Sequence, residues 1–184
     1  YGNTVKDNAL RVTNLPTGGL DAAYGGEVAG LAGDVLKNTL TIVSTQDHTP
    51  APGTNRETLT NAYGGAITNA NNAGAVGSSE EHRGNRVTVS GGQVTNVYGG
   101  YTNGTGKTTG NIVNIGYTDK NGAFHAVADG TKVTGTIYGG SKSDDVTDNT
   151  LNVRGAITAG QIANFEKLNF AVNKDTAGKT LLSI

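Results

Sequence analysis

The sequence predicts an all-β fold, a parallel β-helix (β-solenoid) of about five coils formed by one domain over residues 1–184. The tripeptide Tyr-Gly-Gly occurs four times, and a segment of the pattern Asn-x-aliphatic-x-aliphatic occurs five times. Repetition of this kind is typical of stacked supersecondary units. The 29 glycines and the charged fraction of only 16% favour short strands joined by tight turns.

The Asn-x-aliphatic-x-aliphatic segments predict the first strand of each coil. Their aliphatic positions are all Leu, Val or Ile, and the residues between are mostly polar, so one face of each strand is buried. We expect the asparagines to stack as a ladder at one turn, where their amides satisfy backbone groups. The segments are Asn8–Val12, Asn38–Ile42, Asn85–Val89, Asn111–Ile115 and Asn149–Val153.

A second strand precedes each Tyr-Gly-Gly. Its apolar positions lie directly before the tyrosine and four residues before it, a spacing that breaks strict alternation and predicts a bulge or bend. In the last copy the pattern slips, because Val133 lies five residues before the tyrosine. We expect the tyrosines to stack outside the core or at a corner. They are Tyr24, Tyr63, Tyr98 and Tyr138.

Inserted loops explain the unequal length of the copies. Successive asparagines are 26 to 47 residues apart, and the shortest interval defines the coil. The longer copies carry additional residues rich in Asn, Gly, Thr, Asp or Pro, which we expect to project from the stack. These insertions fall at about Ser44–Glu57, Asn71–Gly84 and Tyr117–Lys132.

Residues 155–184 predict a capping segment after the repeats of residues 1–154. The strand pattern continues here while Tyr-Gly-Gly is lost, and the larger Phe165 and Phe170 replace small aliphatic residues. An apolar strand follows at Thr180–Ile184. We expect a closing coil that covers the end of the core, because an open end would template further strand pairing.

Composition limits the classes of partner. The net charge of −1 and the scattered Lys and Arg residues argue against a nucleic-acid partner, which needs a basic patch. No run approaches the ~20 apolar residues of a membrane span. The lack of Cys leaves the compartment open. The lack of Met indicates that these residues belong to a longer reading frame.

The carboxylate clusters do not predict a catalytic site. Asp144 and Asp145 are adjacent, so on a strand they point to opposite faces, and their Ser-Lys-Ser-Asp-Asp context is typical of a solvated turn. The run Glu80–Arg83 combines acid, base and cation, but it lies in an insertion, so we interpret it as surface charge. We therefore predict no catalytic residue.

The sequence also predicts no cofactor and no metal site. His48, His82 and His125 lie one in each insertion, with no Cys partner and no close His pair to hold zinc. The run Asp119–Gly122 begins like a calcium loop but lacks the later Glu, so it predicts a turn. Gly104–Thr108 ends like a phosphate-binding loop, but its spacing is wrong and no helix follows.

The polar positions of the first strands form two outward columns, which are too irregular to match an ice lattice. They suit a protein or carbohydrate contact surface, and an ordinary solvated sheet face explains them equally well. The tyrosines are better candidates for binding if they are exposed, with a structural ladder as the alternative. The columns are Ala9, Thr39, Arg86, Ile112 and Thr150, and Arg11, Thr41, Thr88, Asn114 and Asn152.

The repeat pattern, complete in Asn85–Gly100, resembles the repeats of bacterial type V secreted proteins, the autotransporter passengers. The tail Ile157–Ile184 resembles the segment that often follows their last repeats. The resemblance spans nearly the whole chain. It implies a right-handed β-helix at the bacterial cell surface or outer membrane, or secreted, with membrane attachment only through a separate barrel domain outside this chain. It carries over no catalytic residue, because no Gly-Asp-Ser-Gly-like or Gly-Asp-Ser-Leu-like segment occurs.

We therefore expect a non-enzymatic passenger segment that acts in adhesion, self-association or virulence. Its partner is expected to be a host or bacterial surface protein or glycan, or a second copy. The main alternative is a polysaccharide-active β-helix enzyme, a lyase or glycosidase, which needs carboxylates and a basic residue gathered along one groove. A third hypothesis is a stalk that only separates an active tip from the membrane.

Overall fold

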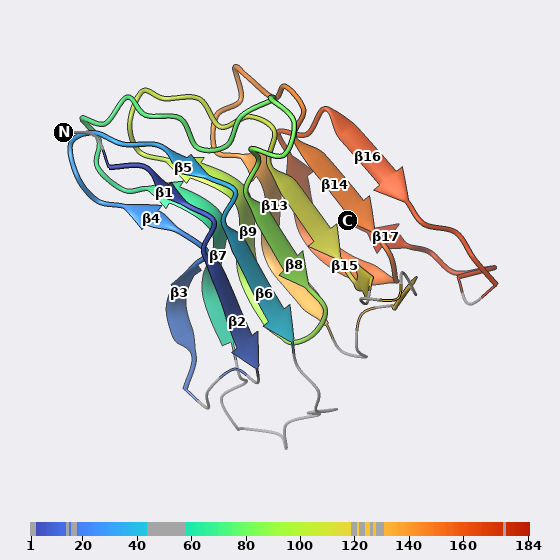
Figure 1. The fold of residues 1–184 in the computed structure, drawn as a ribbon. Helices are drawn as coiled ribbons and strands as arrows, with labels where there is room; N and C mark the ends of the chain where they lie inside the picture. The colour runs from blue at the N-terminus through green and yellow to red at the C-terminus, as the bar shows by residue number, and fades with distance from the viewer. Residues whose placement is uncertain are drawn as a thin grey trace.

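The computed structural model describes residues 3–13, 15, 18–43, 58–118, 121, 124–125, 127, 131–174 and 176–184. Within these residues the regular structure is entirely β, without a helix. Most strands pair in parallel, in one six-stranded and one seven-stranded sheet (Figure 1). The prediction of an all-β fold with parallel strands is confirmed.

The six-stranded sheet is formed by the Asn-x-aliphatic-x-aliphatic segments and one strand from the tail. Leu40, Val87, Val113 and Leu151 are Cα partners across four neighbouring strands, so the aliphatic side chains form a continuous column. Along β6 and β14, buried residues alternate with partly exposed ones, as the period-2 pattern requires. The strands are β2 (Ala9–Thr13), β6 (Thr39–Val43), β8 (Arg86–Val89), β10 (Ile112–Ile115), β14 (Thr150–Val153) and β16 (Lys167–Phe170).

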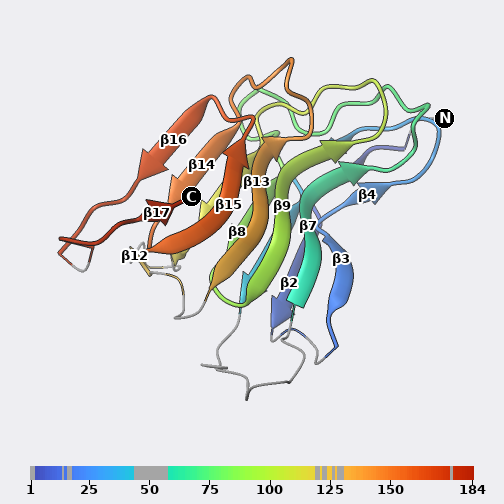
Figure 2. The same ribbon diagram turned by 180° about the vertical axis from the view of Figure 1, so that it is seen from behind.

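The seven-stranded sheet lies behind the first in Figure 1 and in front in Figure 2. Val133 pairs with Val94, and a shift of register before Ile137 absorbs the extra residue of the last copy as a bulge. Two strands continue through Tyr-Gly-Gly, beyond the predicted strand. The strands are β3 (Leu20–Tyr24), β4 (Glu27–Val28), β7 (Thr58–Ile67), β9 (Gln93–Thr102), β13 (Lys132–Gly140), β15 (Ile157–Ala163) and β17 (Leu182–Ser183).

A smaller row of parallel contacts corrects one expectation. β1 (Val5–Lys6) pairs with β5 (Val35–Leu36), and Val76 bridges to Val35. Val76 is fully buried and packs in a second core cluster with Val28, Val35 and Ile67. The expectation that Asn71–Gly84 projects is therefore wrong, because this segment stacks on the preceding copy.

The other two insertions are described in part or not at all. Ser44–Glu57 lies outside the described residues, and β7 begins directly after it at Thr58. In the third insertion β11 (Tyr117–Thr118) pairs antiparallel with β12 (Phe124–His125), apart from the two large sheets. This pair lies directly after β10, and it places Tyr117 beside the outward face of the six-stranded sheet.

The main core lies between the two large sheets and is open at the C-terminal end. Phe165, Leu181 and Leu182 pack against it. Leu168 and Phe170 on β16 are 47% and 46% exposed, so the expectation that Phe170 covers the core is wrong. β16 is the outermost strand of its sheet, and β17 opposite pairs through only two residues. The closing segment therefore covers the core only in part.

Candidate functional site

The five predicted ladder asparagines stack in register. In the last four of them the Oδ1 atom accepts a hydrogen bond from the backbone N–H of the asparagine before it, at 3.0 or 3.1 Å. Their Nδ2 groups donate to backbone carbonyls such as Val35 O, at 2.8 Å from Asn85. The last four asparagines have no exposed surface. This ladder is a structural element without access to a ligand. Its members are Asn8, Asn38, Asn85, Asn111 and Asn149.

The ladder explains the glycines of Tyr-Gly-Gly, a relation that the sequence analysis missed. A Cβ atom on Gly65 would lie 2.6 Å from Cγ of Asn85, and one on Gly100 would lie 2.4 Å from Nδ2 of Asn111. In the first three copies of Tyr-Gly-Gly, the amide of the next asparagine thus occupies the space beside the second glycine, whereas Gly140 in the last copy meets Thr108 instead. Tyr-Gly-Gly and Asn-x-aliphatic-x-aliphatic alternate along the sequence, and this regular order could have indicated that the two motifs contact each other.

The tyrosines also stack, on the outward side of the seven-stranded sheet. The ring centroids of Tyr24 and Tyr63 are 4.8 Å apart, those of Tyr63 and Tyr98 are 5.0 Å apart, and those of Tyr98 and Tyr138 are 4.6 Å apart. Tyr101 packs against the two central rings. Burial raises the pKa of Tyr24, Tyr63 and Tyr98 above the ordinary value. Because the ring faces cover one another, the ladder holds neighbouring strands together.

A candidate site is a hollow of about 620 Å³ on the outward face of the six-stranded sheet. It contains most of the two outward columns predicted from the sequence, and residues at the strand ends add to it. Its described lining is polar apart from two aliphatic side chains and one aromatic ring. The lining residues are Arg11, Thr39, Thr41, Val43, Arg86, Thr88, Ser90, Ile112, Asn114, Tyr117, Asn152 and Arg154.

The floor of the hollow is a hydrogen-bonded row of side chains. Asn114 Nδ2 donates to Thr88 Oγ1 at 3.3 Å, and Asn152 Nδ2 donates to Asn114 Oδ1 at 2.9 Å. Asn169 on β16 continues the row with a bond to Asn152 Oδ1 at 2.9 Å. Since each bond joins neighbouring strands, the row fixes the position of its polar groups.

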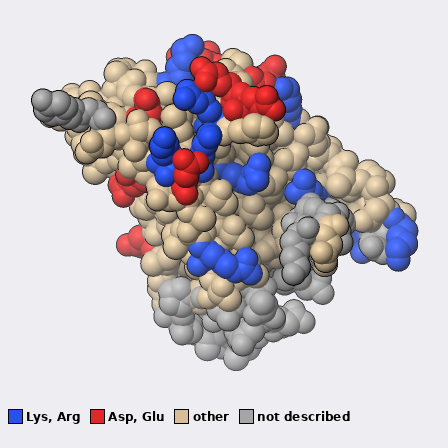
Figure 3. Space-filling model, viewed as in Figure 1, with Lys and Arg blue, Asp and Glu red and all other residues tan. Residues whose placement is uncertain are grey.

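Three arginines and one aromatic ring border this floor. Arg11 lies on β2, Arg86 begins β8, and Arg154 follows β14. The ring of Tyr117 is stacked on His125, with ring centroids 4.6 Å apart. On this face Lys, Arg, Asp and Glu side chains are mixed toward the end where these strands begin, and a few Lys and Arg side chains lie farther along the face (Figure 3).

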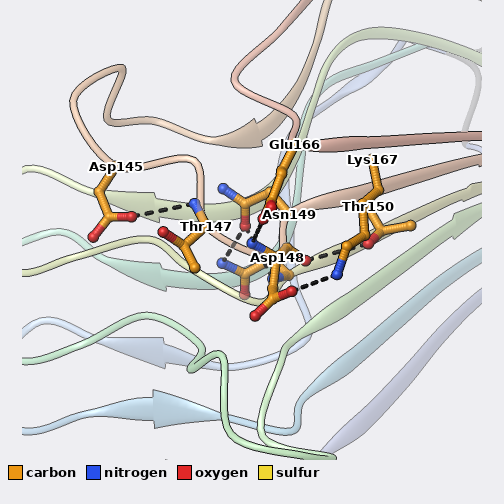
Figure 4. Close-up of polar contacts among 8 residues, drawn as sticks. Asp145, Thr147, Asp148, Asn149, Thr150, Glu166 and Lys167 are labelled. Carbon is orange, nitrogen blue, oxygen red and sulfur yellow. Dashed lines mark hydrogen bonds and ion pairs between the residues drawn. The ribbon is translucent and has the colours of Figure 1, made fainter.

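The acidic residues after β13 form surface ion pairs. Asp145 lies 2.8 Å from Lys107 Nζ, and this hydrogen bond is the main reason that the pKa of Asp145 falls to about 2. Lys167 pairs with Asp148, whose backbone N–H donates to Glu166 (Figure 4). Each of these carboxylates therefore has a structural partner at the turn.

The other residues considered for catalysis or metal binding do not gather into one site among the described residues. In the second insertion Arg83 pairs with Glu80 at 3.0 Å and His82 with Glu81 at 2.9 Å, all at the surface. His48 lies outside the described residues, as does most of Asp119–Gly122. The part of the chain that the structure describes contains no group of three or more His, Cys, Asp or Glu residues able to hold a metal ion.

Comparison with protein-family models, curated proteins and solved structures found no match. Among the described residues no helix is long and apolar enough to cross a membrane.

Proposed function

We propose that the chain is a surface-exposed passenger segment of a bacterial autotransporter, built as a right-handed parallel β-helix. It acts in adhesion, in self-association or as a structural stalk. The observation that carries this proposal is that both large sheets present repeated, in-register columns of side chains to the outside. Each added copy extends the same surface, which suits extended contact with a partner. The resemblance of Asn85–Gly100 to passenger repeats supports the same proposal.

The partner in this proposal is a protein or glycan on a host or bacterial surface, or a second copy of the chain. The chain is displayed on the bacterial cell surface, held at the outer membrane, or released. Antibodies against it are expected to label intact cells of the bacterium that encodes it. Labelling only after lysis would contradict this location.

Attachment of the purified chain tests the adhesive function. Beads coated with the folded chain are expected to bind host or bacterial cells, or the chain is expected to self-associate in analytical ultracentrifugation. Beads coated with heat-unfolded chain serve as the control. If neither binding nor self-association occurs, the stalk function remains, and deletion of this segment from its parent protein should then leave adhesion intact.

The proposal includes no catalysis. A lyase or glycosidase requires carboxylates together with a basic residue along one groove. The described residues that line the hollow include three arginines but no Asp or Glu. Incubation of the chain with a panel of glycans tests this point, because release of a shortened product would favour the enzymatic alternative.

A further inference from the structure

The hollow on the six-stranded sheet combines three cations with an uncharged polar floor. Arg11 and Arg86 are exposed, and Arg154 is half-buried. None of their side chains forms an ion pair with a residue that the structure describes. The described lining contains no Asp or Glu that would neutralise them. A concave surface with charges of one sign attracts a ligand of the opposite sign.

The arginines are spread over the length of the hollow. Arg11 lies on β2, Arg86 on β8 and Arg154 directly after β14, so one strand lies between each and the next, and successive arginines are about 10 Å apart measured across the strands. Arg86 shares a column with Thr39, Arg11 shares the next column with Thr41, and Arg154 lies beyond the end of β14. The charges therefore surround the floor over about 20 Å, which suits several units of a polymer.

The floor suits a ligand that is rich in hydroxyl groups. A side-chain amide nitrogen carries two hydrogens, and the row of Asn114 and Asn152 uses one on each. The second hydrogen can donate to a sugar hydroxyl. The ring of Tyr117, 39% exposed at the rim and fixed by its stack on His125, offers an amphipathic surface to a sugar ring.

A peptide fits this lining less well. Peptides are recognised by main-chain pairing at a free strand edge, by pockets for apolar side chains or, for acidic motifs, by arginine clusters. The hollow lies over the face of the sheet, and Val43 and Ile112 are the only aliphatic side chains in its described lining. Charge and floor together thus favour an anionic glycan over an acidic peptide.

We propose that this hollow binds an acidic polysaccharide, with the guanidinium groups of Arg11, Arg86 and Arg154 paired to its carboxylate or sulfate groups. A guanidinium fork matches such planar or multidentate anions with two parallel hydrogen bonds. The inference rests on the proposed adhesive function, and it names the class of surface glycan to which this face attaches.

Direct binding measurements test the ligand class. The full chain is titrated with polygalacturonate, dextran sulfate, neutral dextran and polyglutamate. We expect saturable binding to one or both acidic polysaccharides, weakening as salt is added, and the two acidic arms separate carboxylate from sulfate recognition. Equal binding of neutral dextran would overturn the role of charge. Equal or tighter binding of polyglutamate would overturn the choice of a glycan.

Charge-matched variants test the site. The triple variant Arg11→Gln, Arg86→Gln and Arg154→Gln should weaken binding about tenfold or more. The matched control carries Lys132→Gln, Lys142→Gln and Lys179→Gln, which remove the same charge from residues that do not line the hollow. The control should bind like the unchanged chain. Equal loss in both variants would show that only net charge matters, and would overturn the site.

A second variant distinguishes a loss of binding from a loss of folding. Thr41→Glu places a carboxylate on the floor, and it should weaken binding of the acidic polysaccharide while the melting temperature stays near that of the unchanged chain. Cell attachment is measured in parallel. A triple arginine variant that keeps full glycan and cell binding would refute the inference and leave adhesion standing. Glycan binding by a chain that attaches to no cell would refute the adhesive function alone.

Discussion

Gly65 and Asn85 show how one pair of residues links two copies of the repeat. The asparagine amide fills the space that a side chain on the glycine would need, and it donates and accepts hydrogen bonds along the stack. Neither residue can change alone, because the glycine keeps the space open and the amide satisfies buried backbone groups. The two motifs therefore form one structural unit across neighbouring copies.

Gly65→Ala is expected to destabilise the fold by about 1–3 kcal/mol, the usual effect of overpacking a buried site. Its new Cβ atom would lie 2.6 Å from Cγ of Asn85. Gly30→Ala is the matched control, since its Cβ atom would meet nothing closer than 3.9 Å. Chemical denaturation measures both variants. Equal stability of the two would contradict the packing of amide on glycine.

Asn85→Ala is expected to cost more than an ordinary surface substitution. It removes the acceptor for Asn38 N–H and the donor to Val35 O, both buried, and each unsatisfied group costs about 1–3 kcal/mol. Asn169→Ala removes an exposed amide with a single bond and serves as the comparison. Thermal unfolding should separate the two clearly. Similar melting temperatures would argue against the ladder as a source of stability.

Asp145 should make the stability of the fold decrease in acid. Its pKa is lowered from 3.8 to about 2, chiefly by the hydrogen bond from Lys107, so its contribution to stability is present above pH 3.8 and is lost as the pH falls toward about 2. Asp145→Asn should therefore make stability depend less steeply on pH in that window. Unfolding at a series of acidic pH values measures this, with Asp144→Asn as the control for net charge.

The tyrosine ladder joins four strands of one sheet and should make the fold sensitive to alkali. Burial raises the pKa of Tyr63 above the ordinary value of 10.0. The folded chain then holds the phenolic proton more tightly than the unfolded chain, so stability falls as the pH rises above 10.0. The strands β3, β7, β9 and β13 should therefore loosen together in alkali.

Tyr63→Phe keeps the stacked ring and removes the ionisable hydroxyl, so its alkaline unfolding midpoint should shift to higher pH. Tyr63→Leu also removes the hydroxyl but loses three ring contacts, each worth about 0.5–1.5 kcal/mol beyond burial, and should melt at a lower temperature near neutral pH. Circular dichroism during alkaline titration follows both variants. A midpoint unchanged in Tyr63→Phe would contradict the link between ionisation and unfolding.

Strand positions were predictable where the pattern had a period of two. The columns through Leu40, Val87, Val113 and Leu151 follow from aliphatic residues at fixed offsets from each asparagine. The segment Asn71–Gly84 was misjudged because its composition is typical of a loop, and one valine, Val76, is enough to anchor it. Continuation of strands through Tyr-Gly-Gly was missed because glycine normally weakens a strand.

The hollow was predictable only in outline. Its two central columns follow from strand register, which the repeat pattern defines. The approach of Arg154 and Tyr117 depends on how the chain leaves β14 and β10, where the repeats no longer resemble one another. Sequence periodicity carries no information on such positions, so the three arginines could not be grouped beforehand.

Across the molecule, stability should be concentrated in the middle of the stack. Leu151 and Leu168 are partners in one column, yet Leu151 is fully buried and Leu168 is 47% exposed. Leu151→Ala should cost about 2–5 kcal/mol, and Leu168→Ala much less. Denaturant unfolding compares the two. Equal losses would indicate that a second copy of the chain covers β16.

The asparagine ladder gives the stack a direction, because each Oδ1 atom faces the preceding copy and each copy is held by the next. A copy added to such a protein continues the ladder only if it brings its own asparagine into register, and a partial duplication without one would interrupt the chain of amides. Loops within a copy can still differ in length, as the unequal intervals between the asparagines show. Complete copies would extend the reach of the molecule.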